Sequence, residues 1–137
     1  TSSVAADLSI PYQSFYSASK SALNAFALAL ANEVRDFGVK VSVLMPGDVA
    51  TGFTDAREKR IEGTTVYKHV ESAVAAMERD ERGGMSPMQM ARILYHMAVC
   101  KILKPIYVGG NIYKVYYWLN KLLPKQFVNW VVGKLYS

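Results

Sequence analysis

The clearest structural signal in the chain lies in residues 14–47, which read SFYSASKSALNAFALALANEVRDFGVKVSVLMPG. Apolar side chains recur at helical spacing until a glycine supplies a stop, so the pattern predicts a helix over residues 14–37. The alternating, valine-rich segment after it predicts a buried parallel strand over residues 39–44, which ends at a Pro-Gly turn. A long helix that leads directly into a buried strand is typical of an α/β fold.

A second strand and a polar loop precede this helix. Residues 1–4 are interpreted as the end of a strand, and residues 5–13 as the loop that follows it. Strand, helix and strand in this order form a crossover unit, and ligands of such sheets bind at the carboxyl ends of the strands. We therefore expect Ser3, Tyr16 at the helix start and the Pro46-Gly47 turn to meet at one edge of the sheet.

Ser3, Tyr16 and Lys20 form the one pattern in the chain that predicts chemistry rather than packing. Tyr16 and Lys20 are spaced i, i+4, so on a helix they lie one turn apart on the same face. The pKa of a free phenol is about 10, and a neighbouring cation lowers it by stabilising the phenolate. Tyr16 would then act as a general acid/base, while Ser3 would hold a carbonyl or alcohol oxygen by a hydrogen bond.

The same Tyr-x-x-x-Lys spacing recurs at Tyr117 and Lys121. Because the chain contains 9 tyrosines and many lysines, roughly one such pair is expected by chance. This second pair lies in an aromatic-rich segment with no serine upstream at the interval that separates Ser3 from Tyr16. We interpret it as a surface pair on an amphipathic helix.

Three motifs agree in order and spacing with a known family. They are Ser-Ser-Val-Ala-Ala from Ser2, Tyr-Ser-Ala-Ser-Lys-Ser-Ala-Leu from Tyr16, and Met-Pro-Gly-Asp-Val-Ala-Thr from Met45. Together they resemble the catalytic half of a short-chain dehydrogenase/reductase, in which a motif serine, a Tyr-x-x-x-Lys pair and a Pro-Gly-x-Val-x-Thr loop follow one another. The aromatic, lysine-rich end is similar, more loosely, to the branch that includes the 11β-hydroxysteroid dehydrogenase-like reductases.

The resemblance implies an oxidoreductase that transfers a hydride between NAD or NADP and a small-molecule carbonyl or secondary alcohol. It implies that Ser3, Tyr16 and Lys20 are catalytic and that Lys20 also hydrogen-bonds the nicotinamide ribose. The backbone of Val49 would meet the carboxamide, and Thr51 would contact the amide or the diphosphate. The implied cofactor-binding residues are Tyr16, Lys20, Pro46, Gly47, Val49 and Thr51. The apolar composition of the later segments favours a lipophilic substrate.

The chain departs from the family pattern in one large respect. Family members hold the dinucleotide with a Gly-rich turn after the first strand, and residues 1–137 contain no such motif. The Asn-Asn-Ala-Gly segment and the catalytic asparagine are missing as well. We therefore expect the C-terminal part of a Rossmann-type, doubly wound parallel sheet without its N-terminal dinucleotide-binding half. Such a piece on its own is expected to be inactive.

Residues 1–110 are interpreted as the catalytic half of this incomplete domain, with a substrate lid at about residues 52–85. The charged residues between 55 and 60 are expected to form the solvated face of that lid. A serine followed by a proline predicts a helix start at Ser86. The further expected elements are a helix at residues 67–79, a helix at residues 87–103 and a short strand at residues 106–109.

Residues 111–137 form an aromatic, basic tail that is expected to be helical and is interrupted by a proline. Neither half reaches the roughly 18 apolar residues that a membrane span requires. The tail could cover the substrate pocket or contact another subunit. Alternatively it attaches peripherally to a membrane, because lysines flank its aromatic surface as in interfacial helices. These lysines are Lys114, Lys121, Lys125 and Lys134. The alternative to an enzyme is thus an inactive binding module that docks on a membrane or a protein through this tail.

Composition narrows the remaining function classes. The net charge of +5 is spread along the chain and no nucleic-acid motif accompanies it, so we expect no nucleic-acid partner. A single cysteine excludes an internal disulfide and suits a reducing compartment. His69 and His96 fall in different predicted helices, so no metal site is expected. These observations favour a cytoplasmic protein, and association with a membrane is the alternative. The whole protein is expected to form homo-oligomers.

Overall fold

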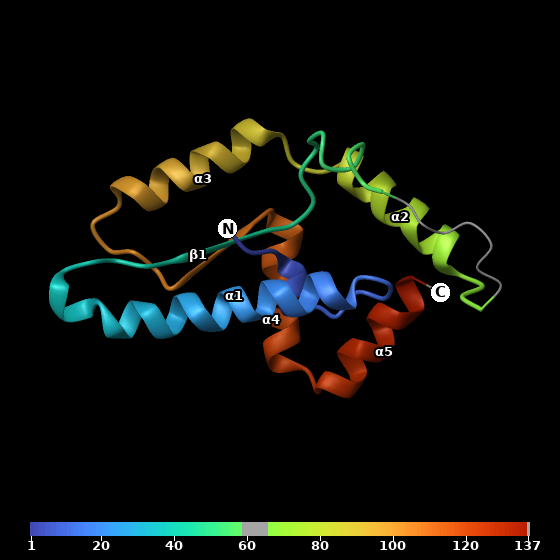
Figure 1. The fold of residues 1–137 in the computed structure, drawn as a ribbon, viewed down its shortest axis with the longest axis horizontal. Helices are drawn as coiled ribbons and strands as arrows, with labels where there is room; N and C mark the ends of the chain where they lie inside the picture. The colour runs from blue at the N-terminus through green and yellow to red at the C-terminus, as the bar shows by residue number, and fades with distance from the viewer. Residues whose placement is uncertain (59–65, 137) are drawn as a thin grey trace.

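The structure is a computed structural model that describes residues 1–58 and 66–136. In chain order the elements are η1 (Val4–Ala6), α1 (Ser14–Glu33), η2 (Arg35–Phe37), β1 (Val43–Pro46), α2 (Val70–Arg82), α3 (Pro87–Val99), β2 (Ile106–Gly109), α4 (Asn111–Leu122) and α5 (Lys125–Leu135), where η denotes a 3-10 helix. Figure 1 shows α3 on one side of the strands and α1 on the other. Helices packed around parallel strands confirm the expected α/β class.

β1 and β2 pair in parallel, with Val43 opposite Ile106 and Pro46 opposite Gly109. β2 lies where the sequence predicts it. β1 begins four positions later than the expected strand at residues 39–44, because β2 offers only a short partner and the ladder ends with it. Since these two strands are the only ones in the described residues, the wider doubly wound sheet stays a prediction.

Residues 1–4 do not form the expected strand. Val4 instead begins η1, and the Ser3 hydroxyl caps this turn by accepting a hydrogen bond from the Ala5 N–H. One strand-like bond remains, because the Ser2 N–H donates to the Leu44 carbonyl oxygen over 2.7 Å. A single ladder bond does not make a strand, but it fixes the segment beside β1 and so places Ser3 next to the carboxyl end of that strand.

α1 confirms the long helix and its stop at Gly38. The helix tightens into η2, and Gly38 takes the left-handed conformation with φ 70° that glycine adopts without steric cost. Of the apolar residues whose spacing predicts this helix, Ala27 packs against the core but Phe26 is 64% exposed, and the polar Ser17 and Asn24 are buried. Small and polar side chains on the inner face let the helix approach η1 and β1 closely.

The helices that follow β1 shift relative to the predicted ranges. α2 begins and ends three residues later than expected. α3 starts as predicted, since Ser86 and Gln89 form a reciprocal capping box with Pro87 in the first turn. It ends at Val99 rather than near residue 103, because Cys100 already has extended backbone leading into β2. Residues 59–65, which belong to the expected lid, lie outside the described residues.

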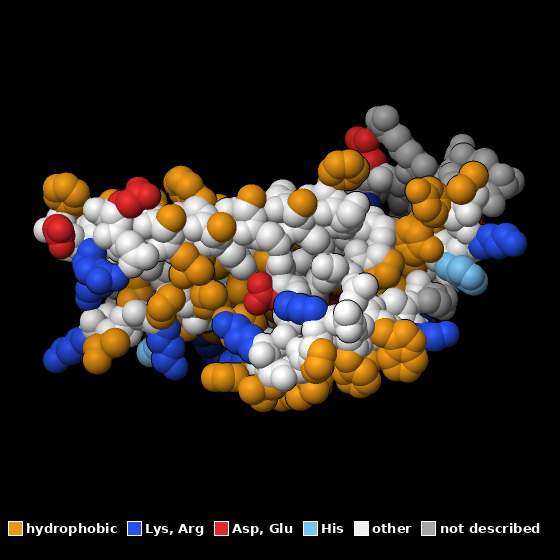
Figure 2. Space-filling view, turned by 90° about the horizontal axis from the view of Figure 1, so that it is seen from below, with side chains coloured by type: hydrophobic (Ala, Val, Ile, Leu, Met, Phe, Trp, Pro, Cys, Tyr) orange, Lys and Arg blue, Asp and Glu red, His pale blue; other side chains and the backbone are white. Residues whose placement is uncertain are grey.

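The tail folds into α4 and α5, and Pro124 separates them as expected. Asn120 anchors α4 to the start of the chain: its side-chain amide donates to the Asp7 carbonyl oxygen over 3.1 Å. Figure 2 shows hydrophobic side chains gathered beside basic ones on the face seen from below, where α5 lies lowest in Figure 1. None of the helices in the described part of the chain has the length and apolarity needed to cross a membrane.

Gly84 shows where two segments distant in sequence approach closely, whereas Gly52 lies in open space. A Cβ atom added at Gly84 would lie 2.5 Å from the carbonyl carbon of Asp48 and 2.8 Å from the backbone nitrogen of Val49. A Cβ atom at Gly52 would meet nothing within 4 Å. The turn after α2 therefore packs directly on the backbone of the loop after β1, and only a residue without a side chain permits this contact.

We predict that Gly84→Ala destabilises the protein by about 1–3 kcal/mol, the usual cost of forcing additional atoms into a packed contact. Gly52→Ala is the matched control and should leave stability nearly unchanged. Urea unfolding midpoints of the native protein and both variants measure the difference. Equal midpoints for the two variants would contradict the close backbone contact.

Candidate active site

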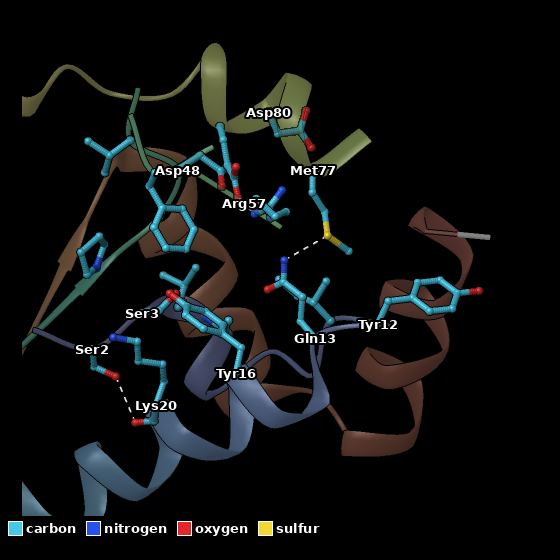
Figure 3. Close-up of a pocket in the computed structure, with 18 of the residues that line it drawn as sticks. Ser2, Ser3, Tyr12, Gln13, Tyr16, Lys20, Asp48, Arg57, Met77 and Asp80 are labelled. Carbon is cyan, nitrogen blue, oxygen red and sulfur yellow. Dashed lines mark hydrogen bonds and ion pairs between the residues drawn. The ribbon is translucent and has the colours of Figure 1, made fainter. Parts of the chain in front are cut away.

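One cavity of about 580 Å³ opens at the carboxyl end of β1 (Figure 3). Its walls come from the first residues of the chain, the start of α1, the loop after β1 and one face of α2. The residues that the sequence singles out all line it: Ser3, Tyr16, Lys20, Pro46, Gly47, Val49 and Thr51. The structure thus brings together the three segments that were expected to meet at one edge of the sheet.

Tyr16 and Lys20 extend from successive turns of α1 toward Ser3 (Figure 3). The Lys20 ammonium lies 5.5 Å from the centroid of the Tyr16 ring, and it donates a hydrogen bond of 3.5 Å to the carbonyl oxygen of Thr1. The Ser2 hydroxyl donates to the Lys20 carbonyl oxygen over 3.1 Å. α1 is therefore tied to the segment that carries Ser3, so the phenol, ammonium and hydroxyl are held on one side of the cavity.

The loop after β1 is fixed by backbone hydrogen bonds on two sides. The Gly47 N–H donates to the Gly109 carbonyl oxygen over 3.2 Å, extending the β1–β2 pairing. Met85 donates to the Asp48 carbonyl oxygen over 2.9 Å, and Ala50 donates to the Met85 carbonyl oxygen over 2.9 Å. Because successive backbone amides point to opposite sides of an extended segment, the N–H of Val49 points away from Met85.

Asp48 and Tyr113 form a hydrogen-bonded pair that sequence reasoning did not find. The Tyr113 hydroxyl donates to a carboxylate oxygen of Asp48. The Tyr113 ring also covers Gly47 so closely that no Cβ atom would fit there. Burial raises the pKa of the Asp48 carboxyl group, and the negative charges of Asp80 and Glu81 raise it further. The hydrogen bond from Tyr113 acts in the opposite direction and lowers this pKa.

Burial likewise raises the pKa of Tyr113, and the hydrogen bond and charge of Asp48 raise it further. α4 therefore holds the loop by a neutral phenol that donates to a carboxylate. The local sequence gives one weak signal of this contact, which is a glycine directly before an acidic residue at a strand end.

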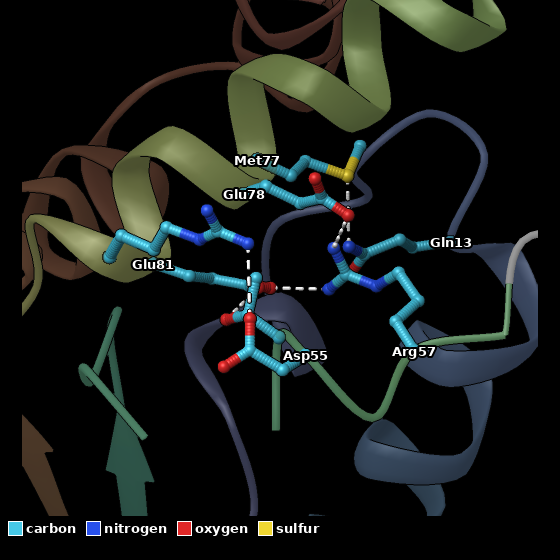
Figure 4. Close-up of polar contacts among 8 residues, drawn as sticks. Gln13, Asp55, Arg57, Met77, Glu78 and Glu81 are labelled. Atoms are coloured by element: carbon cyan, nitrogen blue, oxygen red, sulfur yellow. Dashed lines mark hydrogen bonds and ion pairs between the residues drawn. The ribbon is translucent and has the colours of Figure 1, made fainter. Parts of the chain in front are cut away.

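The charged part of the expected lid is not uniformly solvated, which corrects the prediction for Arg57. Its guanidinium donates to Glu81 over 2.5 Å (Figure 4). The Thr54 hydroxyl donates to the same carboxylate over 2.7 Å. The Arg57 side chain is only 19% exposed and lines the cavity. Asp55 fits the expectation, because its bond to Arg82 is solvent-exposed. Thr54, Asp55 and Arg57 thus attach this segment to α2.

The second Tyr-x-x-x-Lys pair lies apart from this cavity. The Lys121 ammonium lies 4.4 Å from the centroid of the Tyr117 ring. Lys121 is exposed as predicted, but Tyr117 is half-buried against the core beside Val43 and Met45, so the pair is not purely a surface feature. Neither residue lines the cavity that contains Tyr16.

The family model for short chain dehydrogenase matches residues 1–62, which include the loop after β1. A 3-ketodihydrosphingosine reductase of Bacteroides thetaiotaomicron is 38% identical over 105 residues, covering 74% of this chain and 37% of that protein. A dehydrogenase/reductase SDR family protein 7-like of Anopheles gambiae is 31% identical over 134 residues, covering 97% of this chain and 38% of that protein.

A shorter match has a higher sequence identity. A 17-beta-hydroxysteroid dehydrogenase type 6 of Rattus norvegicus is 55% identical over 42 residues, covering 31% of this chain and 13% of that protein. The chain spans well under half the length of these relatives. The matches confirm the resemblance, and the chain is a short-chain dehydrogenase/reductase by family.

The raised pKa of Asp48 gives a pH-dependent prediction. A carboxyl group whose pKa is higher in the folded state stabilises the fold below its ordinary pKa of 3.8, and this contribution is lost as pH rises through the folded-state pKa. Asp48→Asn keeps an oxygen that can accept from Tyr113 but cannot ionise. We therefore expect the free energy of unfolding of Asp48→Asn, relative to native protein, to increase between acidic and neutral pH.

Urea denaturation at several pH values measures this difference, with Asp36→Asn on η2 as a control for removing an exposed carboxylate. If the stability of Asp48→Asn falls relative to native protein as pH rises, the ionised carboxylate is favoured in the fold and the assignment is wrong.

Proposed function

We propose that the cavity at the end of β1 is the catalytic site of an NAD(P)-dependent oxidoreductase that interconverts a carbonyl compound and a secondary alcohol. The observation that carries this proposal is the meeting of Ser3, Tyr16 and Lys20 with the loop of residues 46–51 around one cavity. The chain belongs to an oxidoreductase family, and this membership supports an oxidation–reduction reaction.

Tyr16 moves the proton in this mechanism. In reduction, its hydroxyl gives a proton to the substrate oxygen while the carbonyl carbon gains a hydride, so the C=O double bond becomes an alcohol and the phenolate is left on Tyr16. The Lys20 ammonium, 5.5 Å from the ring centroid, stabilises that negative charge. The oxidation of an alcohol runs the same steps in reverse, with the phenolate accepting the proton.

Ser3 orients the substrate oxygen. Its Oγ accepts the Ala5 N–H over 3.2 Å, so its own hydrogen is the remaining donor and can point to a carbonyl or alcohol oxygen. A hydrogen bond here stabilises negative charge that develops on this oxygen during transfer.

The residues of the loop fit a nicotinamide cofactor, which when bound supplies or accepts the hydride. Val49 lines the cavity, and because its N–H points away from its bridge partner Met85, this N–H would donate to a carboxamide oxygen. Lys20 and Thr51 add an ammonium and a hydroxyl that suit ribose hydroxyls and amide or phosphate groups. Both NAD and NADP are compatible with these donors.

We propose an apolar substrate for the same site. Phe15, Phe53 and Ile10 line the cavity together with Met77, whose sulfur accepts from the Gln13 side chain over 3.0 Å. Two of the relatives carry names that refer to a sphingoid ketone and a hydroxysteroid, which supports a lipophilic carbonyl or alcohol.

Replacement of the phenol tests the catalytic proposal. We expect Tyr16→Phe, in the protein that carries this chain, to lower carbonyl-dependent NAD(P)H oxidation by about 10²–10⁴-fold, the contribution typical of a general acid/base. Tyr117→Phe is the matched control because it has the same spacing to a lysine but lies outside the cavity. Steady-state oxidation of NADH and of NADPH with a lipophilic ketone is the measurement, and equal loss in both variants would reject the assignment.

A membrane-docking role is a second candidate, favoured by the exposed surface of α4 and α5. Trp118 is 64% exposed and Trp130 is 60% exposed, and exposed lysines flank them. Amphipathic aromatics beside basic residues are typical of interfacial helices. Sedimentation with vesicles of phosphatidylserine and phosphatidylcholine tests this role, and Trp118→Ser with Trp130→Ser should weaken binding while Tyr16→Phe leaves it intact. Equal sedimentation of native protein and the tryptophan variants would refute it.

A further inference from the structure

A second cavity, of about 960 Å³, lies beside the catalytic one between η1, α2, α4 and α5. Both cavities have volumes in the range of small-molecule binding sites. The sequence motifs give no role to this second cavity. Its walls are mostly aliphatic or aromatic, as illustrated by Leu119, Leu123, Val131 and Val132.

The two cavities adjoin one another. Val4, Ile10, Asp48, Asp80 and Tyr136 line both of them. α2 forms a common wall, since Met77 faces the first cavity, Ala76 the second, and Asp80 both. A ligand that reaches Tyr16 in the first cavity can therefore extend past these shared residues into the second.

The chemistry of the walls differs between the two cavities. The first cavity is lined by three hydrogen-bond donors, the side chains of Ser3, Tyr16 and Lys20. In the second, the buried Asn120 already uses its side chain on the Asp7 carbonyl oxygen and the Lys125 ammonium, over 3.1 Å each. Tyr113 is likewise engaged with Asp48. Of its charged wall residues, Arg79 and Asp80 are solvent-exposed, and the partly buried Asp48 carboxylate accepts the hydrogen bond from Tyr113. The interior therefore suits hydrocarbon better than a polar head group.

We propose that the second cavity holds the hydrocarbon chain of a substrate whose carbonyl or alcohol group lies at Tyr16. The inference rests on the proposed function and specifies its substrate class as a long-chain aliphatic ketone or its alcohol. The first cavity binds the reacting end, and the second gives the binding energy that favours long chains over short ones. α5 is then a specificity element rather than a simple cover.

A comparison of two methyl ketones tests this inference. In the protein that carries this chain, kcat/KM with NAD(P)H should be much higher for methyl dodecyl ketone than for acetone, rising by up to about fourfold for each buried methylene. Val131→Phe narrows the second cavity and should lower kcat/KM for the long ketone by about tenfold or more. It should leave kcat/KM for acetone unchanged.

Controls separate this inference from loss of folding and from failure of the proposed function. Leu122→Phe is the matched control, because Leu122 is 75% exposed and does not line the cavity. Leu119→Trp, at a wall position that is 43% exposed, gives a second test if thermal unfolding shows that Val131→Phe is not folded. Turnover of both ketones without any effect of these wall variants would overturn the inference alone. Absence of turnover with either ketone would instead reject the proposed function.

Discussion

The carboxyl end of β1 is the constraint on which the candidate site depends. The Leu44 carbonyl oxygen accepts from Ser2 on one side, and the Gly47 N–H donates to Gly109 on the other. These bonds place the chain start and the Pro-Gly loop on either side of one strand end, where open α/β sheets collect their ligands. α1 then needs only to begin beside this point for Tyr16 to face Ser3. The geometry therefore follows from one buried strand and its hydrogen bonds.

The sequence predicts the elements whose signals are local. The α3 start was predictable because Ser86, Pro87 and Gln89 carry the complete capping signal within one turn. The strand bounds were not, since the length of β1 is set by its partner β2 rather than by its own residues. The apolar period of α1 likewise identifies the inner face only in part: Ala27 packs against the core, whereas Phe26 is exposed and the polar Asn24 is buried.

The same distinction holds within the site. Ser3, Tyr16 and Lys20 lie close together in sequence and belong to recognisable motifs, so their grouping could be predicted. The Asp48–Tyr113 bond joins residues 65 positions apart, and the Arg57–Glu81 bond joins residues 24 apart. Nothing in the local pattern of either partner identifies the other, because such contacts arise only when α2 and α4 pack against the loop.

The two Tyr-x-x-x-Lys pairs share the same spacing but lie in different surroundings. The ammonium lies closer to the ring in the second pair, at 4.4 Å for Lys121 on Tyr117 against 5.5 Å for Lys20 on Tyr16. Proximity of a cation therefore does not distinguish them. The surroundings of the two tyrosines differ: Tyr117 packs on the core, whereas Tyr16 shares a cavity with Ser3 and the Pro-Gly loop. A proton can be exchanged with a substrate only where the substrate has room to bind. The proposed role of Tyr16 therefore depends on the cavity beside it, and the Tyr-x-x-x-Lys motif only indicates where in the chain to look for that cavity.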